Sequence, residues 1–189
     1  RMISPNVKST VYCTAIRAGG EKEWNFLWGK YLDSNVAAEK VTILISLGCS
    51  KESWILSRYL DMAFTAGSGI RKQDGNRVFH AVAKNDIGRY LAWNYLRDQW
   101  QKLNEYHVGS FSGLSGYVKI ATAKFNTALE LQELEEFQAK HSGKLGRSKR
   151  VVEQSIERTK NNIAWMDANY EIIEEWLTKK GYGTTIRNS

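Results

Sequence analysis

The feature that most constrains the fold is an apolar repeat with the spacing of an α-helix, which recurs along almost the whole chain. Large apolar residues stand three or four positions apart, and this spacing places them on one face of a helix. No segment shows sustained apolar–polar alternation, so the chain is predicted to be all-α. The clearest repeats are Trp24, Leu27, Trp28, Tyr31 and Leu32; Leu56, Tyr59, Leu60, Ala63 and Phe64; and Val152, Ile156, Ile163, Met166, Tyr170, Ile173 and Leu177.

Breaks between the repeats define the expected organisation. Ala66–Gly69 and Gly109–Gly116 are rich in glycine and serine, and Thr127 with Glu130 fits a capping box that starts a helix. Short connections make consecutive helices antiparallel neighbours. We therefore expect one domain over residues 1–189 with about eight or nine helices, arranged as an α-solenoid of the HEAT or armadillo type. Residues 181–189 are expected to be a flexible tail.

The stretch Asn85–Trp100 combines a helix start, an aromatic face and an arginine. Asn85 or Asp86 is placed to cap the first turn, and Arg89 shares one helical face with Trp93, Leu96 and Trp100. An arginine on an apolar face serves either a site or the fold. The aromatic residues are interpreted as core.

The net charge of +7 arises from scattered lysines and arginines rather than from one long basic run. The densest cluster, Lys144, Arg147, Lys149 and Arg150, is interpreted as a solvated loop that enters a helix. Nucleic-acid binding is only weakly supported by this pattern.

The chain contains two cysteines, Cys13 and Cys49. Their spacing fits neither a CxxC redox motif nor a zinc site. From spacing alone, two free thiols and one disulfide are equally open.

No complete active site is visible in the sequence. The histidines His80, His107 and His141 lack the HExxH spacing of a zinc site, and GxSxG, Walker A and GxGxxG motifs are missing. The acidic run Glu130, Glu133, Glu135 and Glu136 is interpreted as a solvated helix face rather than as an acid/base pair. We predict a chain that performs no catalysis by itself.

Seven segments resemble, in order, the C-terminal domain of the M1 zinc aminopeptidases, the group of aminopeptidase N and the endoplasmic-reticulum aminopeptidases. They cover nearly the whole chain. The segments are VYCTAI (11–16), GGEKEWNFLW (19–28), LGCSKESWILSRYL (47–60), IRKQD (70–74), NDIGRYLAWNYLRDQW (85–100), FNTALELQELEEF (125–137) and EQSIERTKNNIAWMDAN (153–169).

The resemblance implies a helical superhelix that closes over a thermolysin-like catalytic domain and walls the chamber in which peptides bind. The implied enzyme is membrane-anchored and removes N-terminal residues from peptides. Its zinc ligands, in HExxH with a more distant glutamate, and its GxMEN loop would lie in a catalytic domain outside this fragment. The fragment itself is expected to hold no metal or cofactor.

The resemblance also implies a Cys13–Cys49 disulfide, and hence the secretory pathway or the extracellular face of the plasma membrane. The expected partners are the catalytic domain of the same chain and peptide substrates. A homodimer is left open, and nucleic acid is not expected. The membrane anchor would lie outside the fragment, as an N-terminal helix or as a C-terminal GPI lipid following Gly183–Ser189.

The expected chamber residues are Arg89 and the segment Arg71, Lys72, Gln73 and Asp74. The alternative for Arg89 is a pair with Asp86 or Glu105, and the alternative for the segment is a solvated loop. The alternative functions are a stand-alone α-solenoid that binds an acidic protein and a nucleic-acid-binding solenoid.

Overall fold

The computed structural model describes residues 3–107 and 114–182, and every regular element in this part of the chain is helical. The all-α prediction is therefore confirmed for the described residues. The chain divides into two compact units, residues 1–121 and 122–189. The first unit contains η1 (Pro5–Val7), α1 (Lys8–Ala18), α2 (Glu21–Asp33), α3 (Ala37–Leu47), α4 (Ser53–Ala63), η2 (Lys72–Asp74), α5 (Gly75–Lys84), α6 (Gly88–Asp98), α7 (Trp100–Tyr106) and α8 (Ser115–Ala121). The second contains α9 (Ala128–Lys140), η3 (Gly146–Ser148) and α10 (Lys149–Lys179).

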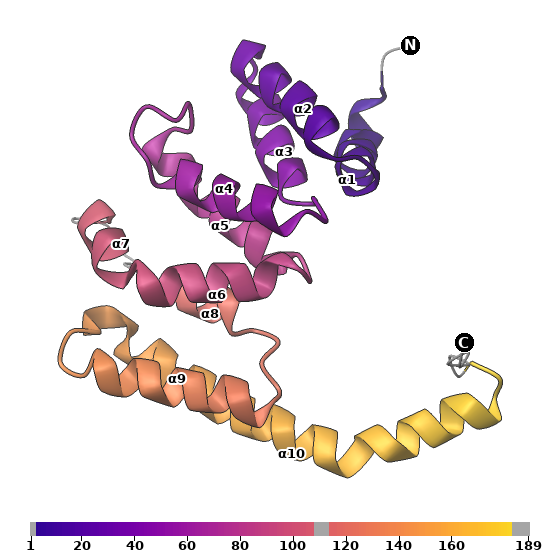
Figure 1. Ribbon diagram of the computed structural model, residues 1–189, viewed down its shortest axis with the longest axis vertical. Coiled ribbons are helices and arrows are strands. Elements are labelled where there is room, and N and C mark those ends of the chain that lie inside the picture. The colour runs from indigo at the N-terminus through magenta and orange to yellow at the C-terminus, as the bar shows by residue number, and fades with distance from the viewer. Residues whose placement is uncertain (1–2, 108–113, 183–189) are drawn as a thin grey trace. The chain divides into compact units, whose positions relative to one another are not determined.

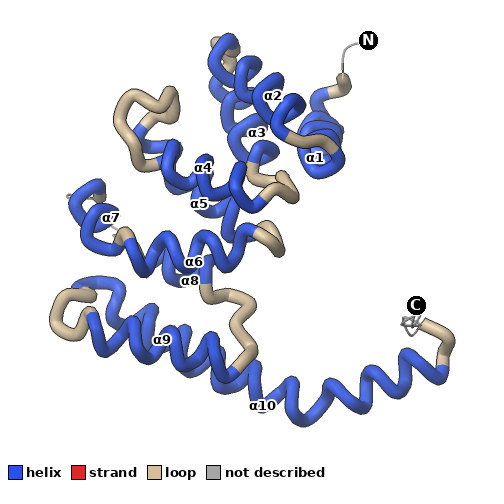
Figure 2. Tube along the Cα trace, viewed as in Figure 1, coloured by secondary structure: helices blue, strands red, loops and turns tan. Residues whose placement is uncertain are grey.

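Helix α5 is at the centre of the packing in the first unit (Figure 1). It contacts α3, α4, α6 and α8, while α1 and α2 pack on α3. Figure 2 shows that short loops join most of these helices. Short connections bring consecutive helices side by side, which is the packing that the solenoid prediction requires.

Two buried aromatic residues join α2 and α4 to the end of α3. The indole Nε1 of Trp24 donates to the carbonyl of Leu47 (3.2 Å), and the hydroxyl of Tyr59 donates to the carbonyl of Leu44 (2.9 Å). The last carbonyls of a helix have no partner within that helix. These side chains therefore satisfy backbone groups that burial would otherwise leave unpaired.

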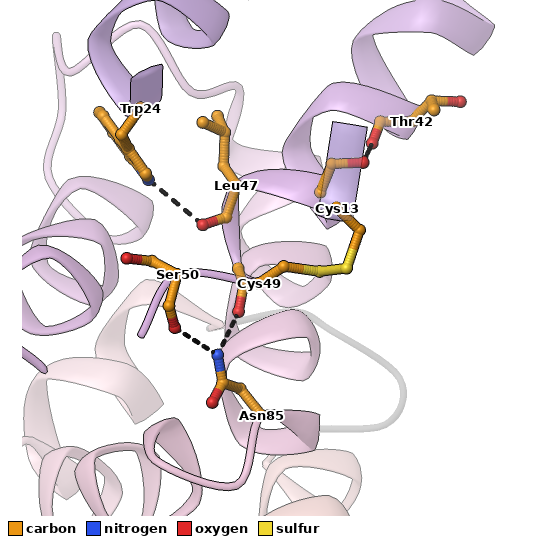
Figure 3. Close-up of a disulfide and its surroundings, with 9 residues drawn as sticks. Cys13, Trp24, Thr42, Leu47, Cys49, Ser50 and Asn85 are labelled. Atoms are coloured by element: carbon orange, nitrogen blue, oxygen red, sulfur yellow. Dashed lines mark hydrogen bonds between the residues drawn. A yellow bond between two sulfur atoms is a disulfide. The ribbon is translucent and has the colours of Figure 1, made fainter. Parts of the chain in front are cut away.

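The Cys13–Cys49 disulfide that the resemblance implied is present and joins α1 to the turn after α3 (Figure 3). The two Cα atoms are 5.3 Å apart, and 36 positions separate the residues in sequence. Such a bond is typical of proteins that fold in the secretory pathway.

Asn85 fastens the same turn from the other side (Figure 3). Its amide Nδ2 donates to the carbonyls of Gly48 (2.8 Å) and Ser50 (2.7 Å), and its Oδ1 accepts the backbone N–H of Ile87 (3.0 Å). Asn85 thus holds the turn that leads into α6 and links it to the residues beside Cys49, but the N-cap position of α6 is Ile87 and not Asn85 or Asp86. A glycine at position 48 lets this turn lie close to α5, because a Cβ there would be 2.6 Å from the Cβ of Ala81.

In the second unit, α9 and α10 run antiparallel and pack on each other (Figure 1). The predicted capping box is confirmed: Thr127 Oγ1 accepts the N–H of Glu130 (3.3 Å), and Glu130 Oε2 accepts the N–H of Thr127 (3.0 Å). The side chain of Asn162 donates to the carbonyl of Phe125 (2.7 Å). These contacts fix the start of α9 against α10. Glu130 is buried, so the interpretation of this residue as part of a solvated face was wrong.

The apolar repeat of α10 is covered along only part of its length. In the proximal half (149–162) Val152 of this repeat is buried, Ile156 is half-buried, and the polar residue Thr159 on the same face is buried. In the distal half (163–179) the same repeat continues through Ile163 and Met166, which are half-buried, to Ile173 and Leu177, which are 43% and 37% exposed. A second apolar row in the distal half is also exposed, and it consists of Trp165, Ile172 and Trp176.

The structure differs from the sequence prediction in three further places. The stretch 85–100 is not one helix, because α6 ends at Asp98 and Trp100 begins α7. Gly116, predicted to lie in a break, is helical within α8. The described residues contain ten α-helices rather than eight or nine. Part of the expected tail lies outside the described residues, but α10 does stop before Gly181, whose φ is +79°.

Candidate functional site

Asp74 organises the predicted segment between α4 and α5. Its side chain is only 3% exposed and accepts Nε of Arg71 at 2.8 Å and Nε of Arg77 at 3.2 Å. The side chains of Arg71 and Arg77 are 50% and 48% exposed. One buried carboxylate therefore holds two guanidinium groups at the surface. We call Arg71, Lys72, Asp74 and Arg77 the Asp74 cluster.

Aromatic residues from α2 and α7 fix the loop that carries this cluster. The hydroxyl of Tyr31 donates to the carbonyl of Gly69 (3.3 Å), and the hydroxyl of Tyr106 donates to the carbonyl of Lys72 (3.2 Å). The ammonium of Lys72 lies 5.1 Å from the centre of the Tyr106 ring. Gly69 has a φ of +93°, which suits glycine at this close contact with Trp28.

Two further titratable groups lie beside the cluster. His107 Nε2 and the hydroxyl of Tyr117 are 2.8 Å apart and form a hydrogen bond. Burial lowers the pKa of His107, and the positive charge of Lys72 lowers it further. Burial raises the pKa of Tyr117. Both groups are therefore neutral near pH 7. Neither of them adds to or offsets the positive charge of the cluster at that pH.

The Asp74 cluster is suited to binding rather than to bond cleavage. Three cations against one carboxylate leave a positive surface, and two of its guanidinium groups are already oriented by Asp74. Guanidinium groups match carboxylates in bidentate hydrogen bonds. The chemistry that this arrangement supports is capture of a carboxylate or of an acidic peptide.

The structure does not bring Arg89 to this cluster. Arg89 lies at the start of α6, beside the end of α5, whereas Asp74 immediately precedes α5. The ten residues of α5 span about 15 Å along the helix axis. The guanidinium of Arg89 donates to the hydroxyl of Tyr90 (2.8 Å) and lies 4.6 Å from the centre of its ring. Trp93 on the same helix is buried, as expected for core.

The sequence prediction included Gln73, which is exposed, and missed Arg77, Tyr106 and His107. Arg77 could have been found, because it stands three positions after Asp74 and so shares its helical face. Tyr106 is 34 positions from Lys72, and no local pattern connects them.

No group of three or more His, Cys, Asp or Glu side chains in residues 3–107 and 114–182 is arranged to hold a metal ion. Across the same part of the chain, no helix has the length and apolar character needed to cross a membrane.

Comparison with known proteins places these observations in a family. The family model described as ERAP1-like C-terminal domain matches residues 1–161. Aminopeptidase N of Homo sapiens is 40% identical over 179 residues, which are 94% of this chain and 18% of that protein. Aminopeptidase Ey of Gallus gallus is 39% identical over 177 residues, 93% of this chain and 18% of that protein. Endoplasmic reticulum aminopeptidase 1 of Mus musculus is 34% identical over 172 residues, 90% of this chain and 18% of that protein.

Proposed function

The chain belongs to the ERAP1-like C-terminal domain family, and we propose that it is the non-catalytic C-terminal domain of a zinc aminopeptidase that removes N-terminal residues from peptides. One observation carries this proposal: aminopeptidases match nearly the whole chain, whereas the chain spans only 18% of their length. The zinc ligands, in an HExxH motif, and a GxMEN loop would then lie in sequence outside these 189 residues.

The distal half of α10 supports association with another part of the same polypeptide. One of its two exposed rows continues the repeat that α9 covers in the proximal half, so this row is suited to packing of the same kind. A contiguous apolar surface of this kind marks an interaction site. The match to human aminopeptidase N covers 94% of this chain, so it extends well beyond residue 161 into the distal half. We assign this surface to docking on the catalytic portion of the enzyme.

Charge favours such a partner over a second copy of α10. At about 100° per residue, the acidic residues Asp167, Glu171, Glu174 and Glu175 fall within about 100° of the helix circumference. Asp167 and Glu174 border the exposed repeat. In a two-fold antiparallel pair of distal halves these borders would face each other, and like charges there are destabilising. A partner with basic residues beside an apolar surface fits better.

The Asp74 cluster supports the chamber-wall role. In this proposal the wall closes over a bound peptide, and Arg71 with Lys72 contacts its acidic groups or its C-terminal carboxylate. Both side chains belong to a loop fixed from α2 and α7, so they are positioned before the peptide arrives. Arg89 is a second chamber residue in the proposal, at a separate position along the peptide.

The disulfide supports a protein of the secretory pathway. We place the whole enzyme on the extracellular face of the plasma membrane or within that pathway. Its anchor would lie outside the sequence described here.

The full-length enzyme tests the chamber role. Lys72→Gln and Arg71→Gln should raise the KM for peptides with acidic residues about ten-fold, which corresponds to about 1.4 kcal/mol. The same variants should leave the hydrolysis of a single-residue amide substrate unchanged, because that substrate is too short to reach the wall.

Arg89→Ala should alter peptide affinity or length preference more than thermal stability.

Lys51→Gln provides the matched control, since Lys51 is an exposed lysine elsewhere in the first unit. Equal changes for peptides and for the short substrate would contradict the chamber role. A sequence upstream of residue 1 without HExxH and GxMEN would contradict the proposed enzyme itself.

A further inference from the structure

The turn between α9 and α10 concentrates positive charge. Residues 137–152, which lie between Glu136 and Glu153, contain five lysines and arginines and no aspartate or glutamate, while the whole chain has a net charge of +7. The rest of the chain is therefore close to balanced. Solvated protein surfaces ordinarily mix both signs of charge. We call the five residues the basic turn: Lys140, Lys144, Arg147, Lys149 and Arg150.

The backbone of the turn directs these side chains outward. Leu145 and Ser148 are buried, and all five cations are exposed. Gly143 and Gly146 have φ values of +77° and +51°, and these left-handed conformations let the chain reverse within a few residues (Figure 1). The cations come from the end of α9, the loop and the start of α10, which this reversal brings together.

The side chain of His141 reports on the charge at this turn. Its pKa is lowered by burial and, in addition, by the positive charges of Lys140 and Lys144. The positive charges of both ammonium groups therefore reach the imidazole of His141. The repulsion among these groups would be relieved by a bound anion.

The start of α10 adds to the positive potential. The first turn of the helix contains Lys149 and Arg150 and no acidic residue. Glu153, one turn later, lies 4.0 Å from Nζ of Lys149 and offsets that one charge in part, so the uncompensated charge comes mainly from the other four cations. Helix N-termini favour negative groups, so two cations here oppose the helix dipole in the unbound protein. A negative ligand would interact favourably with both the side chains and the helix end.

An open groove beside the turn provides space for a chain-like ligand. Its volume is about 500 Å³, and its lining includes Gln138, Ser142 and Lys149. Glu135 also lines it, but its carboxylate is paired with Lys160 at 2.9 Å. The groove therefore presents polar donors without an uncompensated negative charge from Glu135.

We propose that the basic turn binds a linear sulfated polysaccharide. Sulfate groups spaced along a chain match cations spaced along the turn. Residues 144–150 include four of the five cations, and short K/R-rich segments are typical of heparin-binding patches. No Phe, Tyr or Trp lies between Phe137 and Trp165, so the base stacking that single-stranded nucleic acids use has no platform here. The disulfide indicates an oxidising compartment, whereas anionic phospholipids are concentrated on the cytoplasmic leaflet.

Binding of a heparin-derived oligosaccharide to the full-length protein tests this proposal. The triple variant Lys140→Gln, Lys144→Gln and Arg150→Gln should bind at least about ten-fold more weakly at physiological salt, and its affinity should depend less on salt. The control triple variant Lys22→Gln, Lys51→Gln and Lys102→Gln removes the same charge from exposed positions of the first unit. It should change the affinity less than two-fold.

The ligand class is tested with the desulfated oligosaccharide, with phosphatidylserine vesicles and with a single-stranded oligonucleotide. Each should bind the wild-type protein at least ten-fold more weakly than the sulfated oligosaccharide. Equal losses in the two triple variants, or comparable binding of any of these three probes, would overturn the proposal.

A titration of His141 by NMR gives a test that needs no variant. The sulfated oligosaccharide should raise the pKa of His141, because its negative charge offsets Lys140 and Lys144. An unchanged pKa at saturating oligosaccharide would also overturn the assignment. Neither test depends on the aminopeptidase proposal.

Discussion

The two halves of α10 carry one apolar repeat but differ in burial. Val152 in the proximal half is buried, while Ile173 and Leu177 at the far end of the distal half are exposed. Starting a helix is unfavourable, but extending an existing helix is close to neutral. The packed proximal half can therefore supply the start from which the distal half extends. The comparison shows that in this unit a segment can be helical without burying its apolar repeat.

Substitution with aspartate should separate the two halves most strongly. Val152→Asp places an unpaired carboxylate in a fully buried position and should cost about 3 to 5 kcal/mol of unfolding free energy. Ile173→Asp in the 189-residue chain should cost less than about 0.5 kcal/mol, because the side chain is already hydrated. Amide hydrogen exchange in α9 measures both effects. Similar losses in both variants would mean that the distal repeat is covered in solution.

Removal of the disulfide extends the comparison to the first unit, where packing is reinforced covalently. The double variant Cys13→Ser and Cys49→Ser should lose about 3 to 4 kcal/mol, as expected for a closed loop of this size. Hydrogen exchange should accelerate in α1 and α3 and stay unchanged in α9 and in both halves of α10. A uniform acceleration in both units would contradict the independence of the two regions.

The capping box tests how firmly α9 covers the proximal half. Thr127→Ala removes the acceptor for the N–H of Glu130 and should cost about 1 kcal/mol. Thr127→Ser keeps the hydroxyl and serves as the control. The loss should appear as faster exchange in α9 and the proximal half of α10. A change confined to the distal half would show that the cover does not depend on this cap.

Acidification should have the smallest effect and should again distinguish the halves. The pKa of His141 is lowered in the folded protein by burial and by Lys140 and Lys144, so protonation is easier in the unfolded chain. Its contribution to stability is present above the unfolded pKa, near 6.5, and is lost as the pH falls through the lower folded pKa. Between pH 7.5 and 5.5, protection of α9 should decrease slightly.

The distal half of α10 contains no histidine, so its protection should follow only the intrinsic pH dependence of exchange. His141→Gln should remove most of the pH effect in α9. Unchanged pH dependence in that variant would assign the effect to another group.

The helices could be predicted because their signal is local. The spacing of Leu56, Tyr59 and Leu60 is enough to identify α4, and Thr127 with Glu130 marks the start of α9. The break at Gln99 could not be predicted, because no glycine or proline marks it. There Trp100 begins a separate helix and is buried. Which part of α10 is covered depends on where the antiparallel α9 begins, because Asn162 of α10 already contacts the carbonyl of Phe125, just before α9 starts at Ala128.

The candidate site was predicted less completely than the fold. The segment from Arg71 to Asp74 and the disulfide followed from family resemblance, since the cysteine spacing alone left free thiols equally open. Burial of Asp74 and the contact of Tyr106 with Lys72 depend on packing between distant segments. The separation of Arg89 from the Asp74 cluster could be recognised only once the structure showed that α5 lies between them.

The amide of Asn85 also bears on the chemical ageing of the protein. Both of its contacts with Gly48 and Ser50 use the amide as donor. Hydrolysis of this amide to a carboxylate would replace a donor by an acceptor, which would then face two carbonyl oxygens. Two hydrogen bonds would thus be replaced by electrostatic repulsion between the new carboxylate and the carbonyls of Gly48 and Ser50, which flank Cys49. We therefore expect deamidation of Asn85 to destabilise the first unit, and an increase in mass of about one dalton would mark the altered molecules.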